Sequence, residues 1–182
     1  ENPFKVGILS QVNKSAMSIY IGIDPAFRDG GFWACIIDTT DRTANFKEFD
    51  GVENFIHWIY SDDAPEVAFW CVENSNLQNK SFDMTGSASV IARKARNVGT
   101  NQAVSEITCR VLKTKYGPKN VLPISPQQKG AKIVNNAVFL NIVKSDGLTL
   151  TNFGQGNQDK RDAYKIAMIG KQQARIHQQS QK

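Results

Sequence analysis

The sequence is poor in the residues that build disulfide scaffolds and zinc sites. Its 182 residues include three cysteines, Cys35, Cys71 and Cys109, and two histidines, His57 and His177. No two cysteines have CxxC spacing, which argues against a structural zinc site of the usual kind. The cysteines are odd in number and widely spaced. We therefore expect buried, reduced thiols in a cytoplasmic protein rather than a disulfide framework.

Long apolar stretches are also missing from the sequence. No run approaches the roughly 18 residues that are needed to cross a bilayer, so we expect no membrane partner. Residues 1–16 lack the apolar segment of a signal peptide, and we expect an upstream extension or a cloning remnant there. The remainder predicts a single domain over residues 17–177 and a polar tail over residues 178–182.

What the chain does contain is enough apolar residues for a core, at 41%, and a net charge of +5. The positive charge is concentrated in one segment. Between Lys80 and Lys132, ten lysines and arginines are opposed by Asp83 and Glu106 alone. Such a segment favours a polyanionic partner such as nucleic acid, although a solvated helix face gives the same pattern.

Strand and helix patterns follow one another in an order that is typical of a mixed sheet. Short apolar runs predict strands at 18–24, 32–38, 45–49, 66–73 and 121–124. Helical spacing predicts helices at 52–60, 88–116 with a break near Gly99, 129–143 and 159–177, with a loop over 148–158. Turns join the first three strands and helices separate the later ones. The predicted fold class is therefore α/β, with a five-stranded mixed sheet (three antiparallel strands, then parallel ones) flanked by helices.

Acidic residues at the ends of these elements carry the chemical signal. Asp24 closes the first strand, Glu73 closes the fourth, and Asp159 and Asp162 open the last helix. A carboxylate at the end of a buried strand is costly without a partner. If the first and fourth strands are neighbours, Asp24 and Glu73 point into the same cleft. The last helix can add a third carboxylate, since residues three apart share a helix face.

Converging carboxylates repel one another unless a cation neutralises them. Oxygen ligands suit Mg²⁺ or Mn²⁺ rather than zinc, and two such ions about 3.5–4 Å apart support phosphodiester hydrolysis. We therefore expect Asp24, Glu73, Asp159 and Asp162 to be catalytic metal ligands. Plainer roles remain open: a turn cap for Asp24, an ion pair with a lysine for Glu73, and helix capping for the two later aspartates.

At these acids the sequence resembles the RuvC-type Holliday junction resolvases. Residues 21–25 (IGIDP) look like the first-strand motif of that family, with Ala26 where glycine is usual, and Glu73 matches its second acidic position. Residues 159–163 (DKRDA) are similar to its closing signature. Residues 123–126, followed by Lys129 and Lys132, resemble its basic, DNA-contacting segment.

The resemblance implies a ribonuclease H-like fold, two Mg²⁺ ions with Mn²⁺ as a substitute, and a homodimer that makes paired nicks in four-way DNA junctions. It also implies that the four acids are the metal ligands. The chain departs from the family after Glu73, where an aromatic residue is thought to enter the junction. Here no aromatic residue precedes Phe82, which, with Leu77, is a candidate substitute.

Several basic residues are candidates for nucleic-acid contacts. Arg93, Lys94, Arg96, Lys129 and Lys132 could bind backbone phosphates, which positions a nucleic acid without reading its sequence. Lys129 is also a candidate catalytic residue, because a lysine beside the scissile phosphate can stabilise transition-state charge.

Two other functions remain open. A nuclease for RNA–DNA hybrids or ribosomal RNA would use the same fold, although Glu53 is poorly placed to match the first-helix glutamate of a typical ribonuclease H. The second is a nucleic-acid binder without catalysis. Such a binder gains nothing from clustered acids beside phosphate, so the acids favour an enzyme.

Overall fold

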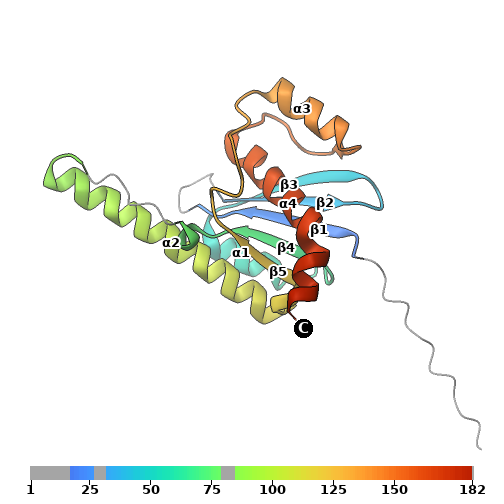
Figure 1. Cartoon of the computed structure of the whole chain (residues 1–182), viewed down its shortest axis with the longest axis horizontal. Helices are drawn as coiled ribbons and strands as arrows, with labels where there is room; N and C mark the ends of the chain where they lie inside the picture. Colours follow the sequence, from blue (N-terminus) through green and yellow to red (C-terminus); the bar gives the residue numbers. More distant parts are fainter. Residues whose placement is uncertain (1–16, 27–31, 79–84, 182) are drawn as a thin grey trace, which may run out of the picture.

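The computed structural model describes residues 17–26, 32–78 and 85–181. These residues form a mixed sheet with helices on both faces (Figure 1). The strands are β1 (Ile19–Asp24), β2 (Phe32–Asp38), β3 (Thr43–Phe49), β4 (Phe69–Glu73), β5 (Val121–Ile124) and β6 (Thr149–Leu150). The α-helices are α1 (Gly51–Ile59), α2 (Ala88–Tyr116), α3 (Asn136–Ser145) and α4 (Gln158–Ser180), with short 3-10 helices η1 (Ser75–Leu77) and η2 (Pro118–Asn120).

The sheet has the strand order β5-β4-β1-β2-β3-β6. Strands β1, β2 and β3 form an antiparallel meander, while β4 pairs parallel with both β1 and β5. The α/β class and the mixed sheet are as predicted. The first and fourth strands are neighbours, which is the condition on which the convergence of Asp24 and Glu73 depends. The predicted number of strands is wrong, because the described residues contain a sixth strand, β6, which pairs parallel with β3.

The alternation of side chains along β1 and β4 decides where their terminal acids point. Ile23 and Val72 are paired across the two strands, and both pack into the core formed with α1 and α2. Successive residues of a strand point to opposite faces. Asp24 and Glu73 therefore point to the other face, which α4 covers (Figure 1).

Helix α4 lies directly on β1 at Gly22. A Cβ atom at Gly22 would lie 2.1 Å from the backbone N of Ala167 and 2.3 Å from the carbonyl O of Ala163. The missing side chain thus lets the two backbones touch. This close approach sets how far the first turns of α4, and the side chain of Asp162, stand from the end of β1.

The three cysteines, Cys35, Cys71 and Cys109, are free and buried, as predicted. Burial raises the pKa of each thiol, that of Cys109 to about 11. The thiols therefore behave as small apolar side chains within the core.

The outer edge of β3 is occupied by β6 and then by one side chain. The Asn152 amide accepts from the backbone N of Phe46 at 2.6 Å and donates to its carbonyl O at 2.7 Å. Asn152 thereby pairs with β3 as a neighbouring strand would. Both features fall in the segment that was predicted to be a loop over 148–158.

Helix α3 begins at Asn136, so the prediction of a helix over 129–143 is wrong at its start. Gly130 has a positive φ of 71°, which ends the preceding turn. The side chain of Asn135 then accepts from the backbone N of Ala137 at 2.7 Å and caps the helix. The helical spacing of apolar residues extends upstream of this cap, but the backbone before Asn136 is not helical.

Other details also differ from prediction, among them the start of β3, which lies at Thr43 instead of residue 45. Helix α2 is continuous through Gly99, where a break was expected. Strand β4 begins at Phe69 instead of residue 66. Helix α4 continues to Ser180, so most of the predicted polar tail is helical.

Helix α2 has two unlike halves. Its second half contributes Val104, Cys109 and Leu112 to the core under the sheet. Its first half, up to Ala103, has no buried side chain and extends beyond the sheet (Figure 1). No helix in the described part of the chain is long and apolar enough to span a membrane.

The contact at Gly22 predicts opposite effects for two glycine-to-alanine substitutions. Gly22→Ala forces backbone against backbone and should lower the free energy of unfolding by at least about 3 kcal/mol. Gly99→Ala is the matched control. No atom lies within 4 Å of its added methyl group, and alanine favours the helix by about 0.5–1 kcal/mol. Urea unfolding of both variants measures the difference, and equal free energies would contradict the packing described.

Candidate active site

Three carboxylates from three different elements meet at one lysine. The Nζ of Lys129 lies 2.6 Å from Oε2 of Glu73, 2.9 Å from Oδ2 of Asp162 and 3.8 Å from Oδ2 of Asp24. We call these four residues the acid cluster. Their side chains are between 6% and 14% exposed, so all four charges are largely withdrawn from water.

A tight turn brings Lys129 to the cluster. Strand β5 ends beside the end of β4, with Glu73 paired to Ile124. The chain then reverses: the backbone N of Gln128 donates to Ser125 O at 3.0 Å, and the Gln128 side chain accepts from Ser125 N at 2.7 Å. Lys129 follows directly and so stands above the end of β4.

Asp162 is held by two partners in the first turns of α4. Its Oδ1 accepts from the Gln158 side chain at 2.6 Å, while its Oδ2 contacts Lys129. The helix is capped by Asn157, whose side chain accepts from the backbone N of Lys160 at 2.8 Å. The capping role that was open for the aspartates therefore belongs to Asn157, and the side chain of Asp162 is turned to the cluster.

Asp159 lies at the margin of the cluster. It is half-buried, whereas Asp162 is 4% exposed. Burial, followed by the charge of Asp162, raises the pKa of Asp159. Of the two aspartates, Asp162 makes the direct contact with Lys129, and Asp159 acts on the cluster at longer range.

Two buried cations brace this end of α4, and the sequence interpretation did not anticipate them. Lys160 donates to Phe153 O at 2.8 Å, and its Nζ lies 4.5 Å from the centroid of the Trp33 ring. Arg161 donates to the Asn136 side chain, which ties α4 to the start of α3. The signal available in the sequence was that both residues lie between the paired aspartates of the DKRDA segment.

The cluster perturbs the titration of Asp24 and Lys129. Burial raises the pKa of Asp24 from 3.8 to about 8; the charge of Lys129 opposes this shift, and the neighbouring carboxylates add to it. For Lys129, burial lowers the pKa, but the charges of Asp24 and Glu73 outweigh burial and the net pKa is raised. Lys129 is therefore a firmly charged ammonium that offsets part of the repulsion among the acids.

The donor set is all oxygen and suits a hard divalent cation. As the side chains stand, no three His, Cys, Asp or Glu residues in the described ranges form a group that could hold a metal ion. The Lys129 ammonium lies at the point on which the carboxylates converge. The acids thus fit a cation of this class, on the condition that the ion replaces the ammonium or draws the carboxylates together beside it.

The other candidate residues are distributed differently. Lys132 is exposed, and its charge lowers the pKa of Asp159, so it acts close to the cluster. Arg93, Lys94 and Arg96 lie on the half of α2 that extends past the sheet. Phe82 falls outside the described residues, and Leu77, the other candidate, is 47% exposed.

Replacing Asp24 by asparagine tests the buried charge. Because the folded state binds the Asp24 proton more tightly than the unfolded state, stability from this group falls as pH rises from about 4 to 8. In the absence of divalent cations, the free energy of unfolding of Asp24→Asn should be higher than that of wild type by at least about 1 kcal/mol at pH 8, and by less at pH 5. The exposed Asp62→Asn is the control. A difference that is independent of pH would contradict this account.

Removing the ammonium of Lys129 should lower the stability of the protein, whereas removing the Asp24 charge should raise it. In EDTA, Lys129→Gln leaves three buried acids without their cation and should cost about 3 kcal/mol. The exposed Lys132→Gln, three residues on, should cost little. Mg²⁺ should raise the melting temperature of Lys129→Gln more than that of wild type, because no ammonium has to be displaced. Equal stability of the two variants in EDTA would exclude this role.

The chain was compared with known proteins at three levels. Comparison with protein families, with curated proteins and with solved structures finds no match.

Proposed function

We propose that this chain is a Mg²⁺-dependent endonuclease with a ribonuclease H-like fold that resolves four-way DNA junctions by paired nicks from a homodimer. One observation carries the nuclease proposal. Asp24, Glu73 and Asp162, from two neighbouring strand ends and one helix, converge on a single cationic position. A fold that only bound nucleic acid would have no use for buried negative charge there.

The cluster suits phosphodiester hydrolysis. In the proposed reaction Asp24, Glu73 and Asp162 would hold magnesium, with Asp159 beside them. When bound, the ions supply an activated water and stabilise the leaving 3′-oxygen. The water oxygen would bond to phosphorus and release a proton to solvent, the bond from phosphorus to the 3′-oxygen would break, and the 3′-oxygen would take up a proton from solvent, which leaves a 5′-phosphate and a 3′-hydroxyl. Lys129, next to the acids, brings an ammonium to the negatively charged phosphoryl group.

The surroundings of the cluster favour a nucleic-acid substrate. Lys132 is exposed and electrostatically close to Asp159. Arg93 and Arg96 are exposed on the projecting half of α2, and Lys94 there is half-buried. No acidic residue lies between Ala88 and Ser105, so this half of the helix presents positive charge to phosphates.

The choice of substrate and the homodimer are supported by the resemblance of three motifs to the RuvC-type resolvases. The acids of these motifs stand at the ends of β1 and β4 and at the start of α4. Two active sites related by a dimer axis can nick the two opposed strands of a branched substrate. A projecting basic helix suits a substrate with more than one duplex arm.

Cleavage of a substrate panel tests the proposal. The panel holds a four-way junction, a linear duplex of the same sequence, an RNA–DNA hybrid and a single strand, each with Mg²⁺ or with EDTA. We expect symmetric nicks in the junction with Mg²⁺ and none with EDTA. Asp24→Asn and Asp162→Asn should each reduce cleavage at least about 100-fold, while the exposed Asp62→Asn should match wild type.

The other outcomes separate the alternatives. Cleavage of the hybrid in preference to the junction would show that the substrate is an RNA–DNA hybrid, while the proposed phosphodiester hydrolysis would still hold. Binding without cleavage of any substrate in Mg²⁺ or Mn²⁺ would make the chain a nucleic-acid binder. Cleavage that persists in Asp24→Asn and Asp162→Asn would remove the acid cluster from the reaction.

A further inference from the structure

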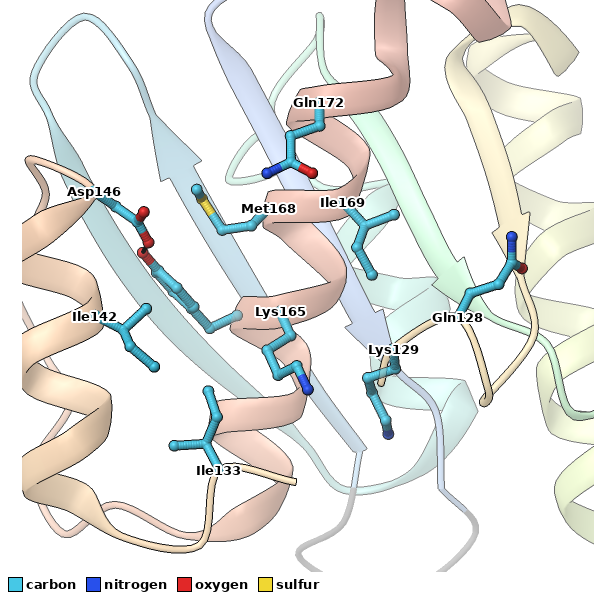
Figure 2. Close-up of a pocket in the computed structure, with 10 residues that line it drawn as sticks. Gln128, Lys129, Ile133, Ile142, Asp146, Lys165, Met168, Ile169 and Gln172 are labelled. Carbon is cyan, nitrogen blue, oxygen red and sulfur yellow. Dashed lines mark hydrogen bonds between the residues drawn. The ribbon is translucent and has the colours of Figure 1, made fainter. Parts of the chain in front are cut away.

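A cavity adjoins the acid cluster on the α4 side of the sheet. It has a volume of about 400 Å³ and lies among α3, α4 and the turn after β5 (Figure 2). That volume is within the range of small-molecule sites. Lys129 lines the cavity and also belongs to the acid cluster, so the two sites are continuous through this residue.

The walls of the cavity are mainly aliphatic. Ile133 and Ile142 come from the α3 side, and Met168 and Ile169 come from successive positions of α4 (Figure 2). Apolar walls on two sides of a cavity suit a flat apolar group, and a nucleobase is held in this way when it leaves the base stack.

Charged groups of opposite sign line different parts of the cavity. Asp146 stands beside α3, where its Oδ2 accepts from the Tyr164 hydroxyl at 2.6 Å. Lys129 and Lys165 lie near one another at the other end of the cavity (Figure 2). Lys129 belongs to the acid cluster, and Lys165 donates to the carbonyl of Ala131. A ligand that matches this pattern has a hydrogen-bond donor at one end, an apolar ring system in the middle and an anion at the other end.

We propose that this cavity is a base-binding site that receives an unstacked guanine from the nucleotide next to the scissile phosphate. The proposal rests on the proposed nuclease function, since that function places a phosphate at the acid cluster. Because Lys129 is shared, a nucleotide with its phosphate at the cluster has its base within reach of the cavity. The unstacking costs a few kcal/mol in paired DNA and less where pairing is already lost, as at a branch point.

The carboxylate of Asp146 selects among the bases. A carboxylate accepts about four hydrogen bonds, and the Tyr164 hydroxyl uses one of these positions. Guanine presents two adjacent donors, N1–H and the N2 amino group, on one edge. Uracil and thymine have a single N–H between two carbonyl oxygens, which the carboxylate repels. Asp146 therefore favours guanine over these bases.

Nucleotide binding can be measured without any cleavage. We suggest NMR of protein labelled at the methionine methyl groups, titrated with the 5′-monophosphates of guanosine, adenosine, cytidine and uridine in Mg²⁺. Met168 lines the cavity, whereas Met17 contacts Gln178 elsewhere, and Met168→Leu assigns the reporter signal. We expect a saturable shift of the Met168 methyl with guanosine monophosphate, and at least tenfold weaker binding of uridine monophosphate.

Variants connect the signal to the carboxylate. Asp146→Asn should weaken the binding of guanosine monophosphate at least tenfold, while the exposed Asp62→Asn should leave this binding unchanged. Ile142→Trp fills the cavity and keeps Asp146, so it should abolish the shift of the Met168 methyl signal. This variant tests the proposal if Asp146→Asn does not fold. Each of three results would overturn the proposal: no shift of the Met168 methyl signal, equal affinity for all four nucleotides, or unchanged binding by folded Asp146→Asn.

The two proposals fail separately. If junctions are cleaved and the Met168 methyl signal does not shift with any nucleotide, the proposed base-binding site is wrong and the proposed nuclease function is supported. If guanosine monophosphate binds as expected and no DNA is cut, guanine binding in the cavity is supported, while the proposed nuclease function and the placement of the cavity beside a scissile phosphate are overturned.

Discussion

Repulsion among buried carboxylates is the constraint around which the end of the sheet is organised. Asp24, Glu73 and Asp162 are largely withdrawn from water, so their negative charge has to be offset by a nearby cation or by proton uptake, and the raised pKa of Asp24 reflects the second effect. Lys129 meets this need from the turn after β5. Strand alternation, the capped start of α4 and the bare backbone at Gly22 all serve to bring these side chains together.

Features set by near neighbours in the chain could be predicted from the sequence. The bounds of β2, β5 and α2 agree with prediction, because turn residues bracket short apolar runs and helical spacing persists over many residues. The orientation of Asp24 and Glu73 toward the same face was predictable only on the condition that β1 and β4 are neighbours, and the structure supplies that condition. It follows from alternation along the strand and from β1 and β4 being neighbours. Lys129 was named from a motif, and the structure places its ammonium within ion-pair distance of all three acids.

Features that depend on distant partners could not be read in this way. Strand β6 has two residues and exists because β3 offers it an edge, so no local pattern marks it. Lys160 would be expected on the surface, yet carbonyl oxygens and the Trp33 ring hold it in the interior. Likewise, which of Asp159 and Asp162 turns toward Lys129 depends on the rotation of α4, and the contact at Gly22 helps to set that rotation.

The pairing of Asn152 with β3 has a consequence for self-association. An open strand edge is a template to which another chain can add a strand. Here the Asn152 amide occupies the backbone groups of Phe46 beyond the short β6, and at the opposite margin β5 carries Pro123, which has no N–H to offer. Both margins of the sheet therefore discourage continuation from one molecule into the next, and two copies of this chain would have to meet through helices or loops.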